Sequence, residues 1–141
     1  MNNKKIILFL VVFGAFMITF IAIGIQHSFG LYLIPITKYL EIGREVFGFS
    51  FALQVFASGI GGFLFGAFSD KHGSGITAFI GAIFFIIGLL WFANVESAFD
   101  IIGCQVLIGF GGAGVGASVV LGAVGRATSE INRTFYLGVV M

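Results

Sequence analysis

An acidic and a basic residue stand side by side in a short polar turn between two long apolar runs. Asp70 and Lys71 follow Gly66 and precede Gly73. A carboxylate near a helix end can pair with a basic side chain or with the positive N-terminal end of another helix. Such a contact can hold one conformation and break in another. Gly66, Asp70, Lys71 and Gly73 are therefore predicted to form a conformational gate, although turns between helices commonly carry a few charges.

A second group of polar residues lies within the apolar runs themselves. Gln26 and His27 are in the first run, and Gln105 is in a later one. Polar and ionisable groups inside a membrane usually face a polar cavity, because exposing them to lipid is costly. We predict that Gln26, His27 and Gln105 line a cavity. Two alternatives stay open: His27 lies neutral near the outer interface, and Gln105 makes a hydrogen bond between helices worth about 0.6 kcal/mol.

The sequence gives no sign of catalytic, metal or cofactor chemistry. Cys104 is the single cysteine and stands in an apolar run. The glycine-rich segment 110–117 is not a phosphate loop, because no Lys-Ser or Lys-Thr pair follows it and no strand precedes it. We therefore expect neither an enzyme nor a cofactor-binding protein.

Composition places the chain in a lipid bilayer. Of its 141 residues, 59% are hydrophobic and 9% are charged, whereas about 25% is usual for charged residues in a soluble domain. The net charge of +1 gives no basis for nucleic-acid binding, which needs clustered Lys and Arg. A spanning helix needs about 20 apolar residues. The apolar runs predict an all-α membrane protein with four spans, at about 6–34, 46–68, 76–94 and 99–124, and part of a fifth at 134–141.

Small residues recur at helical spacing in the second and fourth runs. Steps of four residues lead from Gln54 through Ser58, Gly62 and Gly66 to Asp70, which places all of them on one face of a helix. Small residues let membrane helices approach closely. The predicted helix-packing residues are Ser58, Gly62, Gly109, Gly112 and Gly116. The third run is apolar around its circumference and is expected to face lipid.

The basic residues between the runs indicate how the chain is oriented. Lys and Arg favour the cytoplasmic side of a membrane. With the N-terminus inside, Lys4, Lys5, Lys71, Arg126 and Arg133 are cytoplasmic, while Lys38 and Arg44 are outside. The excess of basic residues on the inner side, five against two, predicts a cytoplasmic N-terminus and a location in the plasma (inner) membrane.

Two segments resemble one family of transporters. The spacing of Gly66, Asp70, Lys71 and Gly73 resembles the loop between the second and third helices of the major facilitator superfamily. The segment 27–36, His-Ser-Phe-Gly-Leu-Tyr-Leu-Ile-Pro-Ile, resembles the end of the first helix in its monocarboxylate and oxalate–formate branch. The chain departs from the family pattern after Gly73, where Ser74 and Gly75 replace the usual basic residues. It departs again at Gln105, where many relatives carry an arginine.

The resemblance implies a secondary transporter that moves a small organic solute, with a monocarboxylate or other organic anion as the candidate, by alternating access. It implies that the chain is the first part of a six-helix half, needs C-terminal helices as partners and is inactive alone. Two alternatives stay open. One is a complete four-helix exporter acting as an oligomer, although no Asp or Glu lies in the first run; the other is a membrane protein that assembles other subunits without transporting anything.

Overall fold

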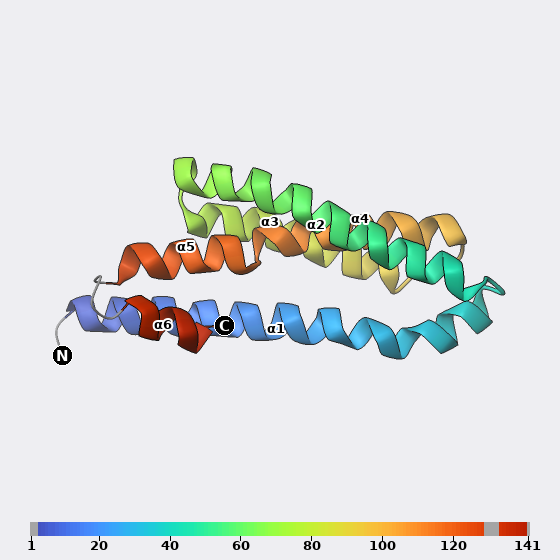
Figure 1. Cartoon of the computed structure of the whole chain (residues 1–141), viewed down its shortest axis with the longest axis horizontal. Coiled ribbons are helices and arrows are strands. Elements are labelled where there is room, and N and C mark those ends of the chain that lie inside the picture. Colours follow the sequence, from blue (N-terminus) through green and yellow to red (C-terminus); the bar gives the residue numbers. More distant parts are fainter. Residues whose placement is uncertain (1–2, 129–132, 141) are drawn as a thin grey trace.

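The computed structural model describes residues 3–128 and 133–140, which form six α-helices (Figure 1). The segments Ile6–Tyr39, Arg44–His72, Ser74–Phe92 and Ala98–Arg126 are long and apolar enough to cross a membrane. The predicted all-α membrane fold is therefore confirmed. In chain order the helices are α1 (Asn3–Tyr39), α2 (Arg44–His72), α3 (Ser74–Phe92), α4 (Ala98–Gly114), α5 (Ala117–Ala127) and α6 (Arg133–Val140).

Helices α2, α3 and α4 pack together at backbone distance (Figure 1). A Cβ atom at Gly109 of α4 would lie 2.1 Å from the carbonyl oxygen of Gln54 in α2. One at Gly81 of α3 would lie 2.6 Å from the Cα atom of Gly114. Neither position has room for a side chain. Close packing of this kind holds helices together in a bilayer, where lipid tails remove the hydrophobic drive for association.

Helix α1 lies beside α5 and α6 (Figure 1). Ala15 of α1 is buried in an apolar cluster with Val120 and Val124 of α5 and Val140 of α6. Further along α1, Phe29 is buried against Phe85 and Ile108. These two clusters attach α1 to the rest of the bundle and leave space between them.

The first helix runs past its expected end near residue 34 and continues through Pro35 to Tyr39. Proline removes one helical hydrogen bond, and hydroxyl side chains nearby can support the backbone of a membrane helix at such a point. The hydroxyl of Thr37 donates to the carbonyl oxygens of Leu33, at 2.6 Å, and Ile34, at 3.2 Å. The helix therefore remains continuous to Tyr39.

The fourth span is broken, although its sequence predicts one run over 99–124. Helix α4 ends at Gly114, and α5 begins at Ala117. Between them, Gly116 has an extended backbone, with φ −80° and ψ −178°. Glycine is a poor helix former, and this segment has glycines at 109, 111, 112, 114 and 116. The packing that requires small residues thus also weakens the helix here.

Two short turns fix the ends of α3. Gly73 alone joins α2 to α3, and its φ of +91° lies in the region that favours glycine. At the other end, the Ser97 hydroxyl accepts a hydrogen bond from the backbone N–H of Asp100 at 3.2 Å and so caps α4. It also donates to the Asp100 carboxylate at 2.7 Å.

Helix α3 has one buried face and is exposed elsewhere. The residues buried by the packing are Thr77, Gly81, Phe85 and Gly88. The large apolar side chains exposed on its other faces are Ile76, Phe79, Ile83, Ile86, Ile87, Leu90 and Trp91.

Candidate functional site

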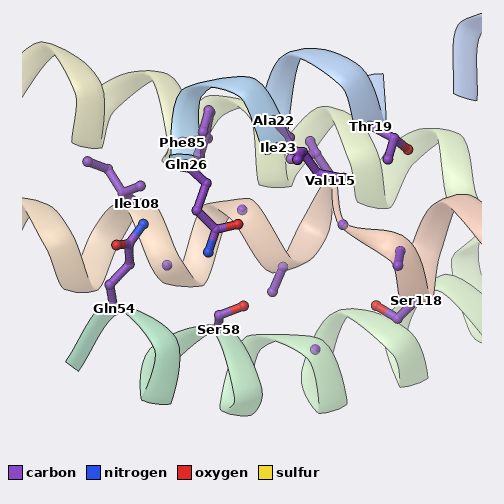
Figure 2. Close-up of a pocket in the computed structure, with 16 residues that line it drawn as sticks. Thr19, Ala22, Ile23, Gln26, Gln54, Ser58, Phe85, Ile108, Val115 and Ser118 are labelled. Atoms are coloured by element: carbon purple, nitrogen blue, oxygen red, sulfur yellow. The ribbon is translucent and has the colours of Figure 1, made fainter. Parts of the chain in front are cut away.

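A cavity of about 290 Å³ lies between α1 and the helices α2, α4 and α5 (Figure 2). It occupies the space between the two apolar clusters of α1, and Phe85 of α3 closes part of its wall. We call it the central cavity. Its lining residues are Thr19, Ala22, Ile23, Gln26, Gln54, Ser58, Gly62, Phe85, Ile108, Gly109, Gly112, Ala113, Val115, Gly116, Ala117 and Ser118.

The polar groups of the central cavity are all neutral. They are the amides of Gln26 and Gln54 and the hydroxyls of Thr19, Ser58 and Ser118. The Thr19 hydroxyl already donates to the carbonyl of Ala15 at 3.0 Å. The lining can therefore offer hydrogen bonds to a polar solute without an opposing or attracting side-chain charge.

Gln54 stands out because it is buried without a full set of partners. It is 2% exposed, and its Oε1 atom has no hydrogen-bond partner among the described residues. In Figure 2 it projects from α2 while Gln26 projects from α1, so the two amides enter the cavity from different helices. A buried polar atom left unpaired costs about 1–3 kcal/mol. Gln105 carries the same kind of cost, with both amide atoms unpartnered in the described part of the chain, so the unpaired oxygen by itself assigns no function to Gln54.

The three residues predicted to line a cavity lie in different places. Gln26 lines the central cavity. His27 is exposed and lines a groove between α1 and the start of α2, beside Arg44 and Phe47, and Gln26 lines this groove as well. Gln105 is 0% exposed and lies outside the central cavity lining, and both of its amide atoms lack a partner among the described residues. Neither a cavity position nor an interhelical hydrogen bond is seen for Gln105.

All five predicted packing residues line the central cavity, and two of them also lie against a neighbouring helix. Gly109 lies against the backbone of Gln54, and Gly112 is within 3.6 Å of the Phe85 ring if a Cβ is added. Ser58, Gly62 and Gly116 line the central cavity, and nothing lies within 4 Å of a Cβ placed at Gly62. A second close contact of α2 with α4 is made at Gly61, the residue before Gly62. A Cβ at Gly61 would lie 2.9 Å from the Cβ of Ala113.

At one end of the bundle, Asp70 is joined to Arg126 of α5. The Nη1 atom of Arg126 donates to Asp70 Oδ1 at 3.1 Å. The Arg126 side chain is 48% exposed and the Asp70 side chain is 78% exposed. Gly66 and Gly73 flank this contact in sequence, with nothing near a Cβ at either position, and Lys71 is exposed. The carboxylate of the predicted gate loop thus has a basic partner on another helix.

Two serines complete the contact. Arg126 Nη2 donates to the hydroxyl of Ser69 at 3.1 Å and also to that of Ser74. We call Ser69, Asp70, Ser74 and Arg126 the Asp70 cluster. Ser74 therefore serves as a neutral acceptor for Arg126.

The sequence interpretation missed Arg126, Gln54 and Ser118 as site residues. Arg126 could have been found as one of the few basic residues predicted on the same side of the membrane as Asp70. Gln54 was placed on the Ser58–Asp70 stripe but assigned no function. No feature of the sequence indicated that Ser118 lines a cavity, because its position depends on the break before α5. The described residues contain no group of three or more His, Cys, Asp or Glu side chains able to hold a metal ion.

Four apolar spans around a cavity that is lined mainly by apolar side chains, with a few neutral polar ones, define an integral membrane protein. The family model of the Major Facilitator Superfamily matches residues 6–141. The chain belongs to the Major Facilitator Superfamily, whose members carry small solutes across membranes. No curated protein and no solved structure gives a match to the chain.

Proposed function

We propose that the chain forms the first part of a secondary transporter that moves a small organic solute, such as a monocarboxylate, by alternating access. Support comes from the central cavity, which lies mainly between the first, second and fourth spans and has neutral polar side chains in a largely apolar lining. Transporters of this general design hold their solute between structural repeats near the middle of the bilayer. The cavity is then half of the solute site.

The Asp70 cluster is the proposed gate. It ties the end of α2 to the end of α5, two helices that also border the central cavity. An exposed ion pair contributes only about 0.2–1 kcal/mol, so it can be broken at small cost. This favours a contact that forms in one conformation and opens in the next over one that holds the fold together.

The proposed orientation has the N-terminus in the cytoplasm and the Asp70 cluster on the cytoplasmic side of the plasma (inner) membrane. Support comes from the distribution of Lys and Arg, five against two. Both members of the ion pair then lie on the side where most of the basic residues are found.

Transport is proposed to require helices beyond the four spans of this chain. The decisive observation for the function as a whole is a cavity with neutral polar side chains in its largely apolar lining, formed between the spans of a Major Facilitator Superfamily chain. The test begins with the DNA downstream of the codon for Met141, where an open frame encoding further apolar spans is expected. A stop codon followed by a stable homo-oligomer would favour a small oligomeric exporter instead.

Uptake by reconstituted vesicles tests the activity directly. The longer protein, the 141-residue chain and empty vesicles are compared for uptake of labelled monocarboxylates and neutral solutes. Uptake by the longer protein alone is expected. Solute uptake by the 141-residue chain above that of empty vesicles would overturn its proposed inactivity, and no uptake of any solute by the longer protein would overturn the transport assignment.

A further inference from the structure

The groove between α1 and the start of α2 adjoins the central cavity. It has a volume of about 420 Å³, and Gln26 lines both spaces. The groove is open to the surroundings, because His27, Arg44 and Phe51 in its lining are exposed. Sites for small molecules usually have volumes of about 300–1,000 Å³. The groove, which we call the α1–α2 groove, is therefore large enough to hold a small solute.

Arg44 gives the α1–α2 groove a positive charge that is not neutralised. No Asp or Glu is among the residues that line the groove, and Arg44 belongs to no ion pair in the described part of the chain. The carboxylate of the next residue, Glu45, folds back over Gly43, where it occupies the place of a Cβ atom. The residues that line the central cavity carry no charge. An anion that approaches these two adjoining spaces therefore meets a permanent positive charge in the groove.

The polar side chains of the groove lie toward its two ends. Arg44 is the first residue of α2, beside the turn that joins this helix to α1 (Figure 1). Gln26 and His27 lie on α1 well before that turn, and the apolar side chains of Leu33 and Phe47 also line the groove. A lipid chain lying along the groove would end against polar groups. A small organic anion fits better, because its charged and apolar parts both find a matching surface.

We propose that Arg44 captures organic anions in the α1–α2 groove before they pass Gln26 into the central cavity. The guanidinium donates to the carboxylate, for which its planar fork is well suited, and the apolar part of the solute lies against Phe47. Arg44 carries this step rather than His27, because arginine keeps its charge whereas histidine is ordinarily neutral above pH 7. The inference rests on the proposed transport function and deepens it, since it names the class of solute and the place of its first contact.

Binding is measured by NMR on the full 141-residue chain in phosphatidylcholine nanodiscs, with ¹³C at the guanidinium carbon of arginine. The Arg44→Gln chain identifies the Arg44 resonance by its absence. Propionate is the ligand, and propionamide and chloride at equal ionic strength are the references. Propionate alone is expected to shift the Arg44 resonance in a saturable way. Equal shifts with propionamide or chloride, or no saturable shift with propionate, would overturn the proposal.

A second variant fills the groove and keeps its charge. Gly48 lines the groove, and nothing lies within 4 Å of a Cβ placed there, so Gly48→Leu should weaken propionate binding by about tenfold or more. Gly59→Leu is the matched control, on an exposed part of α2 outside the groove that is equally free of neighbours, and should bind normally. Unchanged affinity in Gly48→Leu would show that propionate binds a bare surface charge, which contradicts the groove site. A shift of the Arg44 resonance on adding phosphatidylglycerol, with none on adding propionate, would assign the groove to a lipid headgroup instead.

Uptake by the proposed longer protein separates this inference from the transport function. Arg44→Gln should lower kcat/KM for monocarboxylates by about tenfold at low ionic strength. The loss should shrink in concentrated salt, because the Debye length falls from about 30 Å at 0.01 M to about 3 Å at 1 M. Lys38→Gln, which removes an exposed charge outside the groove lining, should behave normally. Normal monocarboxylate uptake by Arg44→Gln would overturn the capture step and leave the transport function intact, whereas no uptake of any solute by the unmodified longer protein would overturn both.

Discussion

Arg126 Nη1 lies 3.1 Å from Asp70 Oδ1, although the two residues are 56 positions apart in the chain. The contact joins the C-terminal ends of α2 and α5. Both side chains remain largely accessible to solvent, so the attraction is screened and the fold does not depend on it. A change in this pair should be seen in the balance between conformations.

Asp70→Asn is predicted to impair transport by the proposed longer protein without preventing membrane insertion. The substitution removes the charge and keeps the shape of the side chain. Losing an exposed ion pair of up to about 1 kcal/mol changes a two-state population by up to about fivefold. We therefore expect uptake to fall by about two- to fivefold, measured as initial uptake at equal protein in vesicles.

Lys38→Gln is the control for this prediction. It removes an exposed charge on α1 that belongs to no ion pair among the described residues. Its uptake should match that of the unmodified protein. Normal uptake by Asp70→Asn, or equal loss in both variants, would remove the gate assignment.

Gly109→Ala is predicted to destabilise the bundle. The new Cβ would lie 2.1 Å from the backbone oxygen of Gln54. Helices α2 and α4 cannot separate to make room for it without losing their packing. Overpacking of this kind costs about 1–3 kcal/mol or more. Thermal unfolding in detergent should show a clear loss of stability. Gly62→Ala, where nothing lies within 4 Å of the added atom, is the matched control and should unfold at or above the original temperature.

Cysteine labelling tests the orientation in the membrane. In a Cys104→Ala background, Asp70→Cys should react with an impermeant maleimide only after cells are permeabilised. Ser97→Cys, in the turn at the far end of α3, should react in intact cells. Labelling of position 70 from the outside would reverse the proposed orientation. In the unmodified chain, Cys104 is fully buried and should not react.

Two neighbouring positions on α1 should differ in their effect on solute binding. Gln26 lines both the central cavity and the groove beside Arg44, whereas His27 lines the groove alone. Gln26→Leu should therefore weaken the apparent affinity for the solute in uptake assays. His27→Ala should leave both the affinity and its pH dependence unchanged. A changed pH profile in His27→Ala would restore this residue to the solute pathway.

The arrangement of spans could be predicted because it depends on the lengths of apolar runs, which are local properties of the sequence. The gate loop could be predicted from the spacing of Gly66, Asp70 and Gly73. Its partner could not be chosen with certainty, since Arg126 reaches Asp70 only after the helices pack. The four-residue stripe on α2 placed Ser58 and Gly62 on one face, but the sequence does not say whether that face meets a helix or a cavity.

The break in the fourth span is the feature that escaped sequence analysis. Glycines at 109, 111, 112 and 114 indicate close packing, and they also lower the cost of leaving the helical conformation at Gly116. Which effect dominates depends on neighbours such as Phe85 and Gly81, which come from other helices. The position of Ser118 in the cavity lining follows from that outcome and was not visible beforehand.

The one-residue connection at Gly73 has a mechanical consequence. Gly73, with its positive φ, is the only residue between the second and third helices, so the connection is as short as it can be. When α2 tilts near this turn, α3 should tilt with it. A force applied at Asp70 would then reach the exposed apolar surface of α3 as well as the central cavity.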